Sequence, residues 1–286
     1  MTTSSEGHYS YAPGATTLLP VATTTDEDRY FPMTTTDPEM LSVETRIRHG
    51  ARRVLRRSKY LMGEYPATLP ILLRMTPIGT TRRITDQTQL VVEGFPRSGN
   101  TFAAYAIWHA AGGDFPLSSH IHHLGAIRLA RKRQLPTVLV VREPLGALAS
   151  YLIAGPHGRP KGVLKEYVSY YSGILPMASN LLVVDFTEIT SNMGAVIERI
   201  NNRFGLEIPP FDHTAENAEA VFAAIQRSDK LGMGEAGVAR PSSQRSLRNQ
   251  QIRESLESPA LVALLGRAES LYLQVRNSDP LPDGFN

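Results

Sequence analysis

The sequence predicts an α/β fold with a central parallel sheet and helices on both faces. Three short apolar segments have the length and composition of buried strands: "LVVEGF" (90–95), "TVLVVRE" (137–143) and "LLVVDF" (181–186). Each is followed by a segment with helical character, and strands that alternate with helices are typical of parallel sheets. The 286 residues are enough for one large domain or two small ones.

The first 40 residues differ in composition from the rest of the chain. They contain ten threonines, six acidic residues and one basic residue, so their net charge is −5, whereas the remainder carries +8. With little periodic apolar patterning, residues 1–40 are expected to form a disordered or loosely packed tail, followed by a single domain over 41–286. The basic domain suggests a polyanionic or phosphorylated partner.

The domain is expected to begin with a basic helix over residues 41–62. Its apolar residues recur at helical spacing on one face, and seven arginine and lysine residues lie elsewhere. Such a helix is either a surface helix with a solvated basic side or a peripheral contact with an anionic membrane or an acidic substrate.

Composition narrows the possible classes of protein. The chain has no cysteine, which excludes disulfides, thiolate metal sites and cysteine nucleophiles and fits a reducing compartment. No apolar run approaches the roughly 18 residues that cross a bilayer, and the first residues do not resemble a secretory signal. These features predict a cytoplasmic protein.

The stretch "VVEGFPRSGNTF" (91–102) has the form of an anion-binding loop between a strand and a helix that we expect from about Thr101 to Ala111. Gly94 and Gly99 are separated by four residues, and the amides of the first helical turn, together with the helix dipole, favour a negative ligand. Phosphate loops of nucleotide triphosphatases place a lysine directly after the second glycine. Here Asn100 occupies that position, and Arg97 lies three positions earlier. A turn without a ligand is the simpler alternative.

The segment "FPRSGNTF" resembles the 5′-phosphosulfate loop of PAPS-dependent sulfotransferases, usually written Y-P-K-S-G-T-T-W. Arg97 takes the lysine position, Asn100 a threonine position and Phe102 the tryptophan position. The resemblance implies a P-loop-like sulfotransferase fold, a clamp of Arg97 on the phosphosulfate, and stacking of Phe102 on the adenine. The loop residues that it implies as donor contacts are Arg97, Ser98, Gly99, Asn100, Thr101 and Phe102.

A second segment, "VVREPLGALASYL", follows the family's pattern for binding the donor's 3′-phosphate. Arg142 ends the predicted strand, Pro144 suits the first position of a helix, and Ser150 lies eight residues after the arginine. Because ligands of open α/β sheets bind at the carboxyl ends of strands, an arginine there and a helical serine can hold one phosphate between them.

The family also has a histidine base between these two motifs, about twenty residues before the second arginine. "SSHIHHLG" offers His120, His122 and His123, and His120 lies 22 residues before Arg142. Histidine suits this role because its pKa lies near neutrality. We predict His120 as the base and Arg97 as the group that stabilises charge on the bridging oxygen. Surface histidines and a metal site are the alternatives, and we expect no metal.

Three further segments bear on the site less directly. "VVDFTEI" (183–189) resembles a strand ending in a magnesium-binding aspartate, but we expect Asp185 to be structural or a helix cap, with Phe186 near the adenine. The Gly- and Pro-rich segment 153–162 is either a mobile loop over the acceptor or a connector. The R-K-G motif of the family is absent; residues 239–250 offer Arg240, Arg245 and Arg248 instead. Helices are expected over 193–206 and 251–275.

Together these features predict a sulfotransferase that moves a sulfuryl group from PAPS to a hydroxyl of a carbohydrate, glycolipid or other small molecule and releases PAP. No nucleic-acid partner is expected. Two alternatives stay open: a P-loop kinase or nucleotide triphosphatase with a degenerate loop, and an inactive nucleotide-binding module on the same fold. Neither the acceptor nor the oligomeric state follows from the sequence.

Overall fold

The computed structural model describes residues 63–75, 83–154, 159–229, 247, 250 and 259–278. By internal contacts the chain divides into Met1–Asp37 and Pro38–Asn286, and every described residue belongs to the second unit. Three predictions lie outside the described residues: the tail over 1–40, the basic helix over 41–62, and the replacement contact from Arg240, Arg245 or Arg248.

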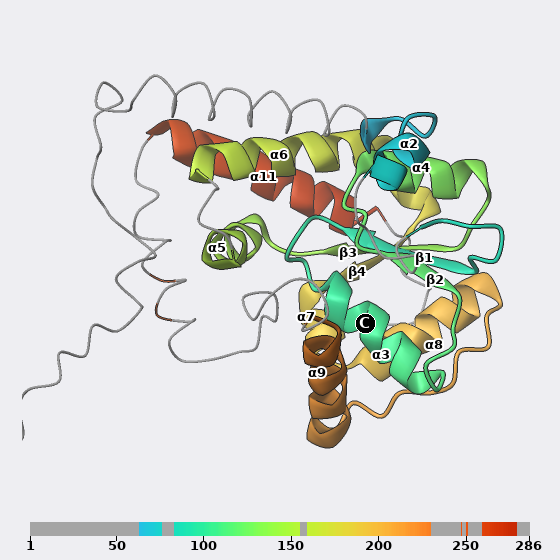
Figure 1. Cartoon of the computed structure of the whole chain (residues 1–286). Helices are drawn as coiled ribbons and strands as arrows, with labels where there is room; N and C mark the ends of the chain where they lie inside the picture. Colours follow the sequence, from blue (N-terminus) through green and yellow to red (C-terminus); the bar gives the residue numbers. More distant parts are fainter. Residues whose placement is uncertain are drawn as a thin grey trace, which may run out of the picture. The chain divides into compact units, whose positions relative to one another are not determined.

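The described chain forms a four-stranded parallel sheet (Figure 1), which confirms the predicted α/β fold class. Its strands are β1 (Leu90–Gly94), β2 (Leu117–Ser119), β3 (Thr137–Val141) and β4 (Leu182–Asp185). The three predicted strands are confirmed. The sequence missed β2 because it has three residues, two of them serines, and so lacks an apolar run.

The strand order is β2-β1-β3-β4. The chain passes from β1 to β2 on one side and then crosses to β3 on the other side of β1. Such a reversal of strand order opens a crevice at the carboxyl ends of the two central strands, where open α/β sheets bind ligands. The predicted phosphate loop follows β1, and Arg142 follows β3, so both lie at this reversal.

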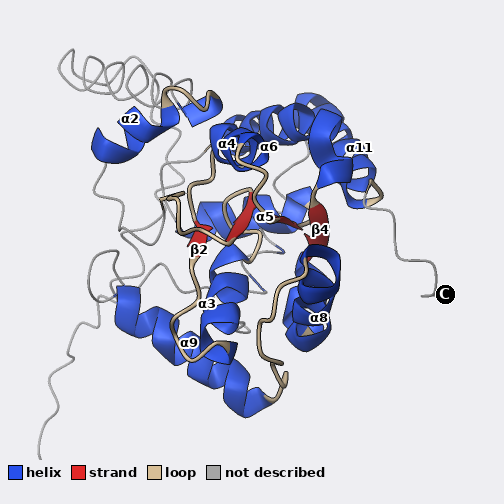
Figure 2. Cartoon of the chain, turned by 90° about the vertical axis from the view of Figure 1, so that its right-hand side faces the viewer, coloured by secondary structure: helices blue, strands red, loops and turns tan. Residues whose placement is uncertain are grey.

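Helices cover both faces of the sheet, as Figures 1 and 2 show. The described helices are α2 (Leu69–Met75), α3 (Asn100–Ala110), α4 (Leu124–Lys132), α5 (Pro144–Ala154), α6 (Pro160–Ile174), the short 3₁₀ segment η4 (Leu175–Asn180), α7 (Phe186–Ser191), α8 (Met193–Phe204), α9 (Ala215–Asp229) and α11 (Pro259–Arg276). Of these, α3, α8 and α9 lie on one face of the sheet, and α4, α5, α6 and α11 lie on the other.

Alternate residues of each strand supply the two cores. Val138 and Val140 of β3 pack with α3 and α8, whereas Leu139 and Val141 pack with α6 and α11. This is the two-residue period of a strand, and because both faces are covered, all five residues of β3 are buried. The continuous apolar runs in the sequence therefore reflect a sheet without a solvent face.

The segment between α5 and α6 is shorter than the sequence predicted. Ile153 and Ala154 still belong to α5, and Pro160 begins α6, so 153–162 is not one continuous loop. Residues 155–158 lie outside the described residues. The start of α6 follows the usual placement of proline at a first helical position, which the Gly and Pro content of the segment obscured.

Candidate functional site

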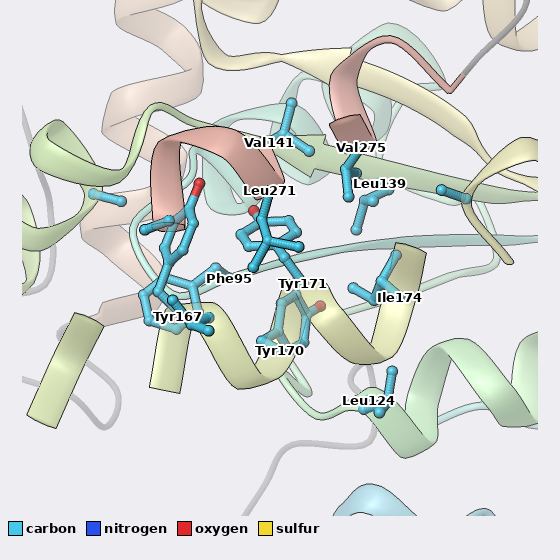
Figure 3. Close-up of a cluster of buried hydrophobic side chains, with 14 of the residues drawn as sticks. Phe95, Leu124, Leu139, Val141, Tyr167, Tyr170, Tyr171, Ile174, Leu271 and Val275 are labelled. Atoms are coloured by element: carbon cyan, nitrogen blue, oxygen red, sulfur yellow. The ribbon is translucent and has the colours of Figure 1, made fainter. Parts of the chain in front are cut away.

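An aromatic cluster fixes the beginning of the predicted phosphate loop. Phe95 directly follows β1, is 3% exposed, and packs against the rings of Tyr167, Tyr170 and Tyr171 of α6 (Figure 3). Its ring centroid lies 5.0 Å from that of Tyr167 in an edge-on arrangement, a preferred geometry for aromatic pairs. Burial also raises the pKa of the Tyr167 and Tyr171 hydroxyls. The loop is therefore anchored in the core at its first residue.

Gly99 directs the loop into α3. It is the N-cap of that helix, in the left-handed region at φ 100°, which glycine adopts without a steric penalty. A Cβ on Gly99 would also lie 2.5 Å from Cδ1 of Ile189 and 3.0 Å from the ring of Phe186. The first N–H groups of α3 have no acceptor within the helix, as at any helix start, so they suit an anion.

The loop side chains do not all face a ligand. Ser98 is fully buried beside Tyr171, and Asn100 is 2% exposed, with Nδ2 donating to the carbonyl oxygen of Gly94 at 3.2 Å. Asn100, which stands where a triphosphatase has its lysine, thus ties the end of β1 to the start of α3. In this arrangement Ser98 and Asn100 offer a ligand their backbone amides rather than their side chains.

The residues of the two predicted motifs contact each other through Arg97. Nε of Arg97 donates to Oγ of Ser150 at 3.2 Å, and Nη1 of Arg142 donates to the backbone carbonyl of Arg97 at 3.1 Å. The first contact joins residues 53 positions apart. It arises because β1 and β3 are neighbours, so the loop after β1 lies beside α5, the helix that follows β3. Two guanidinium groups and a hydroxyl therefore gather at the ends of adjacent strands.

Arg142 is held by aromatic residues from two other elements. Its guanidinium carbon lies 3.9 Å from the ring centroid of Phe186 in α7, a cation–π contact, and its carbonyl accepts the Tyr167 hydroxyl at 2.7 Å. Phe186 thus adjoins both Arg142 and Gly99 and remains partly exposed. Phe102, for which the resemblance implied adenine stacking, is 9% exposed, and its ring packs against Phe222 and His213. Of the two residues, Phe186 is the more exposed.

Asp185 caps α7, as expected. Its Oδ1 accepts the backbone N–H and the hydroxyl of Thr187, and Oδ2 accepts the Tyr272 hydroxyl at 2.6 Å. Glu188 completes a capping box by accepting the N–H of Asp185. Both carboxylate oxygens of Asp185 are therefore used in holding α7 and α11 to the end of β4.

His120 lies against the predicted phosphate loop. It follows β2, which pairs with β1, and its Nε2 is 2.7 Å from Oγ1 of Thr101 in the first turn of α3. Its Nδ1 is 2.8 Å from Oγ of Ser119. This geometry allows the tautomer in which Nδ1 donates to Ser119 and the unprotonated Nε2 accepts from Thr101.

The other two histidines have structural surroundings. Nδ1 of His122 is 2.9 Å from the carbonyl oxygen of Gly94, which can only accept, so that nitrogen carries the proton. His123 is the N-cap residue of α4, and its ring packs against the backbone of Gly63. Burial lowers the pKa of His123. Of the three histidines, His120, which the sequence analysis predicted as the base, has a ring nitrogen at the hydroxyl of Thr101.

The sequence interpretation missed Glu93. This carboxylate lies one residue before the end of β1 and has no exposed surface, and it accepts the backbone N–H groups of Ile121 and His122 at 2.7 and 2.9 Å. The sequence contained a signal for Glu93, because a charged residue inside an otherwise apolar strand needs partners in the core.

Elsewhere, an open depression lies over α4, α6 and η4, and no predicted site residue lines it; its residues are Arg128, Arg131, Lys132, Gly173, Pro176 and Met177. Arg131 and Lys132 complete the last turn of α4, where basic residues stabilise a helix. Within the described ranges, no three or more histidine and acidic residues gather as a metal site, and no helix has the length and hydrophobicity to cross a membrane.

Comparison with known proteins adds no assignment. No protein-family model matches the chain, and a search of curated proteins finds no match. The functional interpretation therefore depends on the residues and their geometry.

Proposed function

We propose that this protein is a PAPS-dependent sulfotransferase that acts on a hydroxyl acceptor. The observation that carries the proposal is the 2.7 Å contact between Nε2 of His120 and Oγ1 of Thr101. In nucleotide triphosphatases the hydroxyl at this loop position holds magnesium. Here it touches a histidine instead, in a loop that also lacks the phosphate-binding lysine. A base beside a phosphate loop suits transfer to a hydroxyl.

The donor set fits the nucleotide. Two guanidinium groups, a serine hydroxyl and the first amides of α3 all match phosphate and sulfate oxygens, and arginine binds such groups in a bidentate manner. PAPS, when bound, supplies a sulfuryl group that an acceptor hydroxyl takes by in-line attack at sulfur while the bond to the 5′-phosphate oxygen breaks. Arg142 and Ser150 are assigned to the 3′-phosphate, and Phe186 to the adenine.

The chain's own residues handle the charge and the proton. Nε2 of His120 accepts the proton of the acceptor hydroxyl and later releases it to solvent. In the structure, the hydroxyl of Thr101 occupies this position at Nε2. Ser119 holds Nδ1 and so maintains the tautomer with Nε2 unprotonated. Arg97, fixed by Ser150, stabilises the negative charge that develops on the leaving oxygen.

A kinase or triphosphatase finds less support in these contacts. Such an enzyme needs a lysine on the transferred phosphate and groups that hold magnesium. Asn100 turns back to the Gly94 carbonyl, and both oxygens of Asp185 already accept hydrogen bonds within the chain. An inactive nucleotide-binding module remains distinguishable by experiment, because it would bind PAP without depending on His120 for any reaction.

Thermal stabilisation by ligands tests the proposal. PAP should raise the melting temperature, because a ligand that binds only the native state stabilises it by about 2.7 kcal/mol at 100 times its Kd. Arg142→Ala should reduce this rise markedly at the same PAP concentration, because its affinity for PAP should be weaker. Arg133→Ala is the matched control, since Arg133 is exposed and pairs with Asp86. Stabilisation by magnesium ATP alone would overturn the proposal in favour of a P-loop kinase.

A further inference from the structure

Glu93 is a buried carboxylate whose burial needs an explanation. It has no exposed surface and is the penultimate residue of the central strand β1. Placing an ionised carboxylate in a protein interior costs several kcal/mol unless hydrogen bonds compensate. Each carboxyl oxygen of Glu93 accepts a backbone N–H group. Ile121 donates to Oε1 at 2.7 Å, and His122 donates to Oε2 at 2.9 Å. The carboxylate therefore clamps the turn that follows β2.

This turn has a backbone conformation that needs support. His120 and His122 have φ angles of 66° and 56°, in the left-handed region. Non-glycine residues in that region cost about 1 kcal/mol or more each, and they persist only where their surroundings hold them. Successive N–H groups in such turns converge into an anion-binding concavity. In this chain the carboxyl group of Glu93 fills it.

The clamp also determines where His120 lies. The residue directly before the two clamped amides is His120, whose ring contacts Ser119 and Thr101. His122 adds a second tie, from Nδ1 to the carbonyl of Gly94, the residue after Glu93. The end of β1 therefore holds both the start of the phosphate loop and the histidine turn, so the two parts are joined at one short segment.

We propose that Glu93 is a positioning residue: by binding the amides of Ile121 and His122, it holds His120 against the phosphate loop in the orientation that a general base needs. The inference rests on the proposed role of His120. It assigns a function to the one carboxylate of β1, which does not itself touch a donor or an acceptor.

The experiment uses Glu93→Gln in the full chain, with the histidine ring signals followed by NMR. Glutamine keeps the size of the side chain but replaces one acceptor oxygen with an N–H donor that faces an amide. The His120 ring signals should shift, and turnover with PAPS should fall about 10- to 100-fold, because a displacement of about 1 Å in a catalytic group has such an effect. PAP affinity should stay within about twofold, below the effect of one hydrogen bond.

Two comparisons separate positioning from a general loss of structure. Glu143→Gln removes a carboxylate that accepts a backbone N–H, from Gly146 at 2.7 Å, beyond the end of β3; it should leave the His120 signals unchanged. In the His120→Ala background, Glu93→Gln should reduce turnover no further, since residues that act through one group are not additive. Unchanged His120 signals in Glu93→Gln, or a full additional loss in the double variant, would overturn the inference.

Hydrogen exchange in the unaltered protein covers the case in which Glu93→Gln does not fold. The amides of Ile121 and His122 should exchange as slowly as those of the sheet, because both are bound to a buried carboxylate. Exchange at the rate of an open loop contradicts the clamp. The NMR and exchange readouts need no PAPS. If the wild-type protein did not bind PAP but still protected these amides from exchange, the proposed function would be contradicted and the clamp would stand.

Discussion

Two regions meet at the carboxyl edge of the sheet, and they are built differently. The predicted donor region lies between the loop after β1, the end of β3 and α5: the Arg97 side chain donates to Ser150, and the Arg142 side chain donates to the Arg97 backbone. The histidine turn after β2 is held through its backbone, by Glu93, and presents one ring to the loop. A side-chain cluster suits the binding of a polyanion, whereas a rigid turn suits the orientation of one base. The two regions should therefore affect different steps.

The largest expected effect is on the chemical step, and it comes from the histidine turn. His120→Ala should lower turnover about 100- to 10,000-fold, the usual contribution of a general base, while PAP affinity stays nearly unchanged. Single-turnover transfer of labelled sulfate from PAPS is the measurement. Wild-type turnover in this variant would remove His120 from the mechanism and favour a non-catalytic role for the turn.

Arg142→Ala should act on the other region. Loss of a charge-assisted contact to phosphate costs about 1.5–3 kcal/mol, which corresponds to a roughly 10- to 100-fold weaker affinity for PAP. Titration calorimetry with PAP and with adenosine 5′-phosphate distinguishes the contact, because only PAP carries the 3′-phosphate. An equal loss of affinity for both nucleotides would contradict the assignment of Arg142 to that group.

Ser150→Ala tests the same region and should have a smaller effect on PAP affinity. One neutral hydrogen bond contributes about 0.5–1.5 kcal/mol, so PAP affinity should fall roughly two- to tenfold. Because Ser150 also holds Nε of Arg97 at 3.2 Å, turnover should fall together with affinity. A loss of affinity with turnover at saturating PAPS unchanged would mean that Ser150 does not support Arg97.

The smallest effect concerns stability near the histidine turn. Burial lowers the pKa of His123 in the folded state, so the unfolded chain binds more protons between the folded pKa and 6.5. Its contribution to stability is complete above pH 6.5 and is lost as pH falls toward the folded pKa, at no more than about 1.4 kcal/mol per pH unit. Urea unfolding of His123→Asn at pH 7.5 and 5.5 should show less pH dependence than the wild type.

The sequence predicted the parts of this site that depend on local pattern. The glycine loop, Arg142 at a strand end and Pro144 at a helix start are fixed by short-range rules, and parallel neighbours bring Arg97 to Ser150. The sequence could not show that β2 exists, because "LSS" has no apolar run. It therefore also could not show that Glu93 and His120 share one edge. The burial of Phe102 under α9 likewise depends on packing between distant segments.

The separation of the two regions is tested most directly by calorimetric titration of PAP into His120→Ala and Arg142→Ala side by side with the wild type. We expect the wild-type dissociation constant in His120→Ala and a roughly 10- to 100-fold larger one in Arg142→Ala. Equal weakening in both variants, or no PAP binding by the wild type, would contradict the account of a donor site built from the loop and Arg142 beside a separately held base.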